Sequence, residues 1–117
     1  MKLTPGQIVI MDLRDALPDE PSKRGRPCIV VENPAIFGDA YLNVIVVPLT
    51  HDSSISIDLA KTTIDPTPEN GCDARSYANA AHVSSSSRSR IVRATESRIT
   101  AVQLATIRAQ IALCIAA

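Results

Sequence analysis

The stretch "NVIVVPLT" (Asn43–Thr50) is the most hydrophobic segment of the chain, and it decides the fold. Its β-branched residues favour a strand. Its nearly continuous apolar character indicates a strand that is buried on both faces rather than one that has a solvated side. The rest of the chain therefore has to supply cover for both faces of this strand.

Two further strands are predicted on the N-terminal side of this segment. "QIVIMDL" (Gln7–Leu13) follows a glycine and is rich in β-branched residues. "PCIVVEN" (Pro27–Asn33) is a second strand, in which proline is tolerated at the first position. Between them Arg14–Gly25 contains two prolines and mixed charges, which predicts a long loop. A turn is expected around Gly38–Asp39.

The segments on the C-terminal side are less regular. "SISIDL" (Ser54–Leu59) alternates polar and apolar residues, as a half-buried strand does. Residues 61–74 contain two prolines and a glycine and are expected to form a long surface loop. "SYANAAHV" (Ser76–Val83) is interpreted as a strand, although its alanines have modest strand propensity. "SSSSRSR" (Ser84–Arg90) is compatible with a loop, a short helical turn or a solvated strand.

The C-terminus has the signature of a helix. Thr100 and Gln103 have the spacing of a capping box, in which each side chain binds the other residue's free backbone N–H. An apolar stripe follows at helical spacing, and the helix is expected from Ala101 to about Ala116. The stripe consists of Leu104, Ile107, Ile111 and Cys114 or Ile115. Five or six short strands before one helix predict a β-rich α+β fold, a compact barrel with a helical lid.

Composition restricts the class of protein. The 117 residues predict a single domain over residues 1–117, and aromatic residues make up only 3%, so the core must be aliphatic. The formal net charge is zero, but residues 1–70 carry six basic and ten acidic side chains, whereas residues 71–117 carry six and two. Such asymmetry is compatible with a polyanion-binding face and also with an ordinary solvated surface.

Several kinds of site are not indicated. The three cysteines are odd in number and widely spaced, which argues against a disulfide framework or a zinc site and fits a reducing compartment. No phosphate loop, dinucleotide fingerprint or metalloprotease motif is present. His51 and His82 are the only histidines, without a third ligand at a metal-like spacing. No cofactor, metal or membrane segment is expected, and the predicted location is cytoplasmic.

The order of these motifs resembles the MazF/PemK toxins of bacterial toxin–antitoxin pairs. "GQIVIMDL" is similar to the family's first strand, "RPCIVVEN" to its Arg-Pro step into an aliphatic strand, and "VVPLT" to its Pro-Leu-Thr strand end. The stretch "SYANAAHV…SRI" resembles a later strand in which a glutamine commonly occupies the position of His82. The resemblance extends from about Gly6 to Leu113.

The resemblance implies a small SH3-like barrel of the CcdB/PemK type with a C-terminal amphipathic helix. It also implies a homodimer, a cognate antitoxin as partner, and a metal-independent endoribonuclease that cuts single-stranded RNA. In this family the ribose 2′-OH attacks the adjacent phosphate, which leaves a cyclic phosphate and a 5′-OH. Arg26 matches the arginine of the Arg-Pro step and Thr50 the threonine of Pro-Leu-Thr. A planar guanidinium is suited to the phosphorane, because it donates two parallel hydrogen bonds and remains charged.

Other residues are candidates for binding the substrate. By their position near the matched motifs they are Lys23, Arg24, Pro27, His51 and Asn79. Each has an ordinary alternative: Lys23 and Arg24 can be solvated charges, and His51 can be a solvated turn residue. The catalytic candidates have alternatives too, since Arg26 can pair with Asp12 or Glu32, and Thr50 can be a plain strand residue.

The chain also departs from the family pattern. Ala81 stands where many members carry an acidic residue, and Ser84 stands where many carry an arginine. His82 is expected to compensate in part as a proton carrier or by stacking on a base. The alternative is a toxin fold that has lost catalysis and only binds RNA, an antitoxin or a gyrase-type protein target. The absence of Trp argues against the gyrase-type target.

Overall fold

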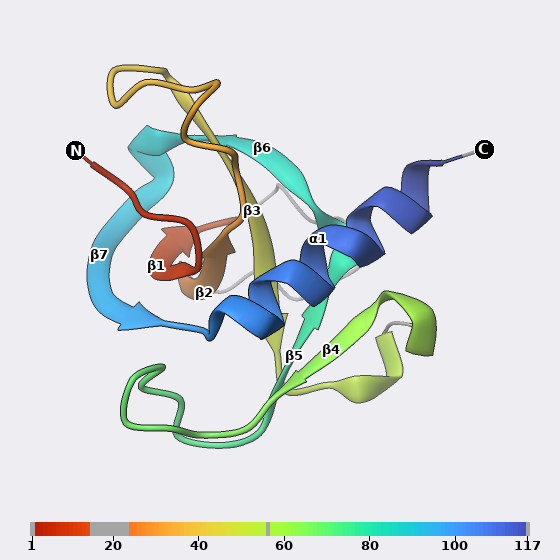
Figure 1. The fold of residues 1–117 in the computed structure, drawn as a ribbon. Helices are drawn as coiled ribbons and strands as arrows, with labels where there is room; N and C mark the ends of the chain where they lie inside the picture. Colours follow the sequence, from red (N-terminus) through yellow and green to blue (C-terminus); the bar gives the residue numbers. More distant parts are fainter. Residues whose placement is uncertain (1, 15–23, 56, 117) are drawn as a thin grey trace.

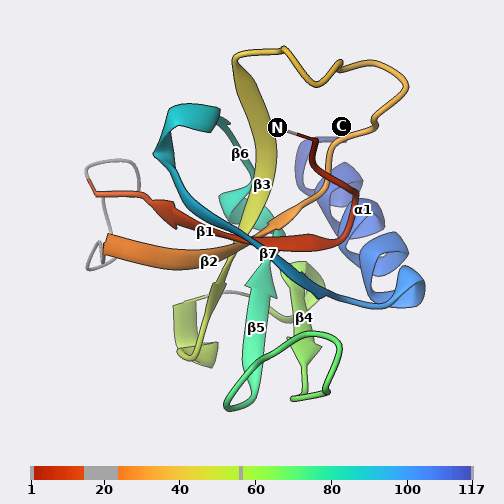
Figure 2. The same cartoon turned by 90° about the vertical axis from the view of Figure 1, so that its left-hand side faces the viewer.

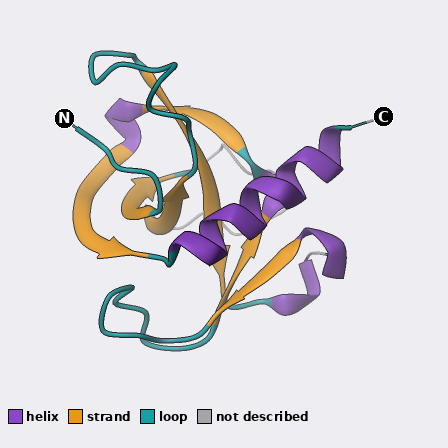
Figure 3. Ribbon diagram, viewed as in Figure 1, coloured by secondary structure: helices purple, strands orange, loops and turns teal. Residues whose placement is uncertain are grey.

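The computed structural model describes residues 2–14, 24–55 and 57–116. One α-helix and seven strands lie in these ranges, joined in places by single-turn 3-10 helices (Figure 1, Figure 3). The strands are β1 (Gln7–Asp12), β2 (Arg24–Val30), β3 (Asn43–Thr50), β4 (Lys61–Ile64), β5 (Ser76–Asn79), β6 (Ser84–Ser87) and β7 (Ile91–Arg98), and the helix is α1 (Ala101–Ile115).

The strands form one antiparallel sheet in the order β4-β5-β3-β2-β1-β7, and β6 pairs with β3 beside β5. The sheet is strongly bent, so that β1 and β2 extend across the direction of β3, β4 and β5 (Figure 2). This arrangement confirms the predicted β-rich fold with a C-terminal helix. Within the described ranges the outer strands β4 and β7 do not pair, so the expected barrel is curled but not closed.

The central position of β3 follows from its sequence. β3 pairs with β2 on one edge and with β6 and then β5 on the other. Successive side chains of a strand point to opposite faces, and β3 has apolar residues at both sets of positions. Val44 and Val46 lie in one buried cluster, and Val47 and Leu49 lie in the other. The prediction that this strand is buried on both faces is therefore confirmed.

The two buried clusters occupy opposite faces of the bent sheet. The first includes Ile8, Ile29, Val47, Leu49, Ile64 and Ile107, and α1 covers it. The second includes Val9, Met11, Cys28, Val30, Val44 and Val46. Both are aliphatic apart from Met11 and Cys28, as the shortage of aromatic residues requires.

The helix begins where the capping box predicts. Thr100 Oγ1 accepts a hydrogen bond from the backbone N–H of Gln103 (3.1 Å), and Gln103 Oε1 accepts one from the backbone N–H of Thr100 (3.0 Å). Leu104, Ile107 and Ile111 pack on the sheet. The predicted stripe was wrong at its end, because Cys114 and Ile115 are exposed.

Three predictions between β3 and β7 need correction. The expected strand at Ser54–Leu59 is wrong, since Ser53–Ile55 and Asp58–Ala60 are 3-10 turns, and residue 56 lies outside the described ranges. The expected loop at 61–74 begins instead with β4, which pairs with β5. The strand expected at Ser76–Val83 ends at Asn79 and continues as a 3-10 turn.

Candidate functional site

The strands β2 and β3 separate at the end where the matched motifs lie. Their last paired residues are Cys28 and Pro48. Arg26 precedes Cys28 by two residues and Thr50 follows Pro48 by two, so alternation places both on the face of Cys28 and Pro48. In Figure 2, the β1–β2 hairpin points to the left while β3 runs downward. We call this opening the fork.

On β2, the position of Arg26 is set by its pairing with β1. Arg26 lies opposite Met11, whose side chain is fully buried, and the register shifts immediately after Met11. The residue before it, Gly25, has a φ of +91°, which a residue with a side chain rarely adopts. Arg26 itself is half-buried. The backbone that carries its guanidinium is therefore anchored on one side by the core.

Thr50 forms the other side of the fork. It is half-buried, pairs with Tyr77 of β5, and its Oγ1 accepts a hydrogen bond from the backbone N–H of Asp52 (3.1 Å). The Asp52 carboxylate in turn accepts hydrogen bonds from the hydroxyl (2.6 Å) and backbone N–H (2.9 Å) of Ser54, which lower the pKa of Asp52. The Thr50 hydroxyl proton remains available for donation to a ligand.

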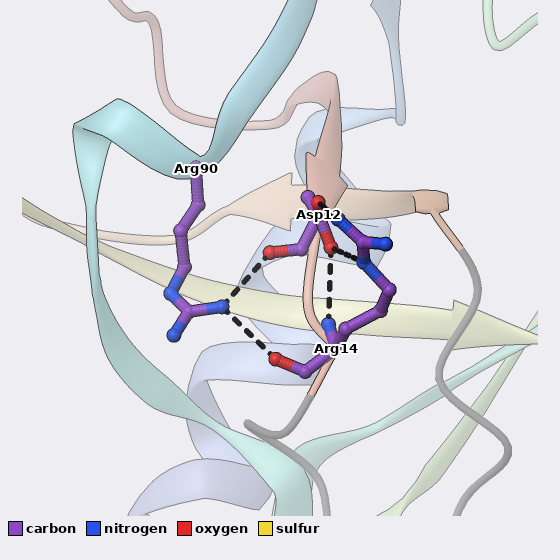
Figure 4. A network of polar contacts seen from close by, with 3 residues as sticks. All are labelled: Asp12, Arg14 and Arg90. Atoms are coloured by element: carbon purple, nitrogen blue, oxygen red, sulfur yellow. Dashed lines mark hydrogen bonds and ion pairs between the residues drawn. The ribbon is translucent and has the colours of Figure 1, made fainter.

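A basic network lies beside the fork at the end of β1 (Figure 4). The Arg14 guanidinium binds both carboxylate oxygens of Asp12, at 2.9 and 2.7 Å. Arg90 Nη1 donates to the backbone carbonyl oxygens of Asp12 (3.1 Å) and Arg14 (3.2 Å). Two guanidinium groups therefore meet at Asp12, that of Arg14 on its carboxylate and that of Arg90 on its backbone carbonyl, and Arg26 lies on the adjacent strand.

Pro27 of β2 points to the opposite face of the sheet from Arg26, and His51 is the first residue after β3. Both line a cavity of about 360 Å³. The imidazole Nδ1 of His51 lies 3.1 Å from the backbone carbonyl oxygen of Arg75. The carbonyl oxygen can only accept, so Nδ1 carries a proton and the neutral ring leaves Nε2 as an acceptor.

His82 and Asn79 are placed elsewhere. His82 ends the 3-10 turn Ala80–His82, which lies against α1, whereas Thr50 pairs with Tyr77, five residues earlier. Asn79 is only 2% exposed, and its side chain accepts a hydrogen bond from the backbone N–H of Ala81 (3.1 Å). Asn79 therefore caps the 3-10 turn that follows it, and its contact with substrate stays a prediction.

Two sequence candidates remain, Lys23 and Arg24. Lys23 lies outside the described ranges, and Arg24 belongs to β2, where its backbone lies opposite Asp12 of β1. At the positions that depart from the family pattern, Ala81 is exposed and Ser84 pairs with Val46 of β3, with its hydroxyl 3.1 Å from that of Ser86.

Sequence reasoning missed Arg14 and Arg90 of the basic network and Arg93, which lines the cavity. For Arg90 and Arg93 the available signal was the excess of arginine in the second half of the chain, and for Arg14 there was none. Across the described ranges, no three His, Cys, Asp or Glu side chains are grouped as metal ligands would be. Of the helices in the same ranges, none has the length and hydropathy needed to cross a membrane.

Comparisons with known proteins agree with the motifs and the fold. The chain resembles three solved structures: MazF from Deinococcus radiodurans (20% identity, TM-score 0.77, covering 100% of this chain and 99% of that one), an endoribonuclease in complex with its cognate antitoxin from a mycobacterial species (17%, 0.72, 97% and 95%), and an endoribonuclease from a mycobacterial species (17%, 0.68, 98% and 93%). At these identities the likeness establishes the shared fold.

Sequence comparisons identify the family. The search of curated proteins gave no match. The model of the PemK-like, MazF-like toxins of type II toxin–antitoxin systems matches residues 4–115, which is nearly the whole chain. With the fold and the ordered motifs, this match shows that the chain belongs to the PemK-like, MazF-like toxin family.

Proposed function

We propose that the protein is the toxin of a toxin–antitoxin pair and a metal-independent endoribonuclease that cuts single-stranded RNA at the fork. The observation that carries this proposal is the position of Arg26 and Thr50, each two residues beyond the last β2–β3 pair and on the same face. The family match supports the assignment, as do two similar structures that are described as endoribonucleases.

The proposed reaction is a transesterification within the RNA. The ribose 2′-oxygen forms a bond to the adjacent phosphorus, the bond from phosphorus to the 5′-oxygen breaks, and the proton lost by the 2′-OH is balanced by one gained by the leaving oxygen. Arg26 donates two hydrogen bonds to the phosphorane oxygens, and the hydroxyl of Thr50 donates a third. Each such donor, when pre-organised, contributes about 3 kcal/mol to the transition state.

His82 remains a proposed proton carrier. The place of His82 beside α1 and beyond β5 supports this role only for an RNA strand that passes the end of β5. A His82→Ala variant that cleaves at the parental rate removes it from the mechanism. Arg24 and Lys23 are proposed to contact the RNA backbone, and Pro27 and His51 to contact the nucleotide beside it.

The test is cleavage of a long single-stranded RNA by purified protein in excess EDTA. We expect products with 5′-OH ends, and a loss of about 100-fold or more in rate for Arg26→Ala. Arg98→Ala is the matched control, since it likewise removes one arginine, here an exposed one at the end of β7 that pairs with Gln7. Folded protein that leaves a broad panel of RNA sequences intact would instead favour the binding module without catalysis.

The assembly is part of the proposal. We propose that a cognate antitoxin covers the fork and that the toxin acts in the cytoplasm as a homodimer. The similar mycobacterial structure with its antitoxin supports the proposed antitoxin partner. Light scattering on the purified protein tests the homodimer, and a mass equal to that of one 117-residue chain would contradict it.

A further inference from the structure

Lys61 is a cation that lies near Thr50 and has no role in the reaction described above. It is the first residue of β4, where the sequence pattern predicted a loop. Because β5 separates β4 from β3, the backbone of Lys61 lies two strand spacings, about 10 Å, from β3. β2, which carries Arg26, pairs with the other edge of β3. Lys61 and Arg26 therefore lie on opposite sides of Thr50.

The side chains of Lys61 and Thr50 lie on the same face of the sheet. Lys61 pairs with Asn79 of β5, and Tyr77, two residues before Asn79, pairs with Thr50. Residues that lie opposite each other in an antiparallel pair share a face, and so do residues two apart on one strand. Arg26 was assigned to the face of Thr50 by the same alternation. The three donors therefore follow one another across β2, β3 and β4 on a single face.

The ammonium group of Lys61 is held close to the residues around Thr50. Its Nζ lies 5.5 Å from the ring centroid of Tyr77, the residue opposite Thr50, at a distance that allows a cation–π interaction. Nζ also donates to the carbonyl oxygen of Ser53 (3.4 Å), in the 3-10 turn that follows Thr50 by three residues (Figure 3). The positive charge therefore stands between the neighbour of Thr50 on β5 and the turn after β3.

The ion pair that Lys61 makes leaves its charge available to a ligand. Asp58 Oδ1 lies 3.3 Å from Nζ, and the Asp58 side chain is 97% exposed, whereas that of Lys61 is 19% exposed. A carboxylate in water contributes little to such a pair. The contacts of 3.3 and 3.4 Å are long for hydrogen bonds, and an ammonium has three donors. A phosphate oxygen can therefore replace the Asp58 carboxylate at this ammonium.

We propose that Lys61 binds an RNA phosphate that flanks the scissile one, on the side of Thr50 away from Arg26. The inference rests on the proposed function, because RNA at the fork supplies the phosphate. An ammonium suits this contact, since it is a compact point charge that needs no fixed planar geometry. The contact is additional to those of the arginines at and beside the fork, and it positions the strand without taking part in the chemistry.

The first experiment measures binding and needs no cleavage. Fluorescence anisotropy gives the affinity of a non-cleavable 2′-O-methyl oligoribonucleotide and of versions in which one phosphate at a time is a neutral methylphosphonate. Lys61→Met removes the charge but keeps an apolar stem against Tyr77, and it should weaken binding about tenfold, as the loss of one charged hydrogen bond does. At one linkage the methylphosphonate and Lys61→Met should not be additive, because both remove the same contact.

Two further variants control this measurement. Lys2→Met removes an exposed lysine that lies near Gln7, at the end of β1 away from Arg26, and it should be additive at every linkage. Lys61→Arg restores a cation and should restore the coupling. Additivity of Lys61→Met at every linkage would overturn the proposal, and so would equal coupling for Lys2→Met.

The second experiment leaves Lys61 in place and changes the affinity in the opposite direction. Asp58→Asn removes the carboxylate that competes with the phosphate, so the unmodified oligoribonucleotide should bind about threefold more tightly. Asp39→Asn, at an exposed carboxylate between β2 and β3, controls for the loss of one negative charge. Equal gains for the two variants, or a gain for Asp58→Asn that persists in combination with Lys61→Met, would contradict a phosphate contact at Lys61.

Cleavage in EDTA distinguishes this inference from the proposed function. Lys61→Met should raise KM about tenfold and change kcat little, because the flanking phosphate is bound equally before and during the reaction. Coupling at one linkage in a protein that cleaves no RNA would support the phosphate contact and contradict the nuclease. Cleavage that depends on Arg26, with Lys61→Met additive at every linkage, would support the nuclease and overturn the phosphate contact.

Discussion

Thr50 combines a structural and a proposed catalytic contact in one hydroxyl. Its Oγ1 accepts the backbone N–H of Asp52, so Thr50→Val, which keeps the β-branched shape, should lower the free energy of unfolding by about 1 kcal/mol. Because the variant also loses the donor to the phosphorane, we expect its RNA cleavage rate to fall by about 100-fold. Urea unfolding and cleavage in EDTA measure the two effects.

Thr50→Ser is the matched control, since it keeps the hydroxyl and loses one methyl group. It should cleave close to the parental rate. A valine variant that cleaves as fast as the serine variant would show that the hydroxyl takes no part in the reaction.

The turn after Thr50 makes the stability of the fold depend on pH. Hydrogen bonds from the hydroxyl and the backbone N–H of Ser54 lower the pKa of Asp52 in the folded state. A carboxylate with a lowered folded pKa stabilises the fold fully above its unfolded pKa of about 4, and this stabilisation is lost as the pH falls through the folded pKa. The stability difference between the parental protein and Asp52→Ala should therefore be present near neutral pH and should shrink below about pH 4.

Urea unfolding at several pH values measures this difference. Asp39→Ala, which removes an exposed carboxylate in the connection between β2 and β3, is the matched control for the loss of one negative charge. A stability difference for Asp52→Ala that stays constant down to about pH 2 would contradict the prediction.

At the residue scale, the sequence indicates one half of the site. Arg26 and Thr50 are found because each belongs to a motif contiguous with a core strand, so a short pattern defines them. Arg90 and Arg93 are not found, since they reach Asp12 and the cavity only through the pairing of β1 with β7. No periodicity connects segments that are about 80 residues apart, and that juxtaposition has to come from the tertiary structure.

The loop between β4 and β5 depends on one amide side chain. Asn70 is 4% exposed and satisfies two backbone N–H groups and one carbonyl. Asn70→Ala leaves these groups without their partners, so we expect a loss of about 2 kcal/mol or more in the free energy of unfolding.

Glu69→Ala is the matched control for Asn70→Ala. Glu69 is exposed and contacts β7 through its backbone carbonyl, which the substitution retains. Thermal unfolding of both variants tests the prediction. Equal stabilities of the two variants would show that Asn70 does not organise this loop.

At the element scale, the strands with continuous apolar runs were predictable and the short ones were not. β1, β3 and α1 carry enough apolar residues to be found, whereas β2 was predicted with shifted bounds, since it runs over Arg24–Val30 and not Pro27–Asn33. The alternating segment Ser54–Leu59 fails as a strand because Asp52 and Ser54 bind each other locally, which offers the backbone an alternative to a ladder. β4 has four residues, too few for a pattern, and forms because β5 is available as a partner.

The whole molecule has a formal net charge of zero, which restricts how it can bind RNA. A net charge of zero gives no overall attraction for a polyanion, so we expect the affinity to come from the local group of arginines at and beside the fork, Arg14, Arg26 and Arg90. For single-stranded nucleic acid, each phosphate contact contributes about −0.7 to the slope of log K against log salt. About three contacts therefore predict a slope of about −2.

Removal of one of these arginines should change the slope as well as the affinity. Arg14 is 54% exposed in its side chain, so Arg14→Ala should reduce the slope by about 0.7 without unfolding the protein. Arg98→Ala, at the opposite end of the β1–β7 pair, should leave it unchanged. Anisotropy titrations of non-cleavable RNA over a series of salt concentrations measure the slopes. If both variants lower the slope equally, RNA contacts are spread over the surface rather than concentrated at the fork.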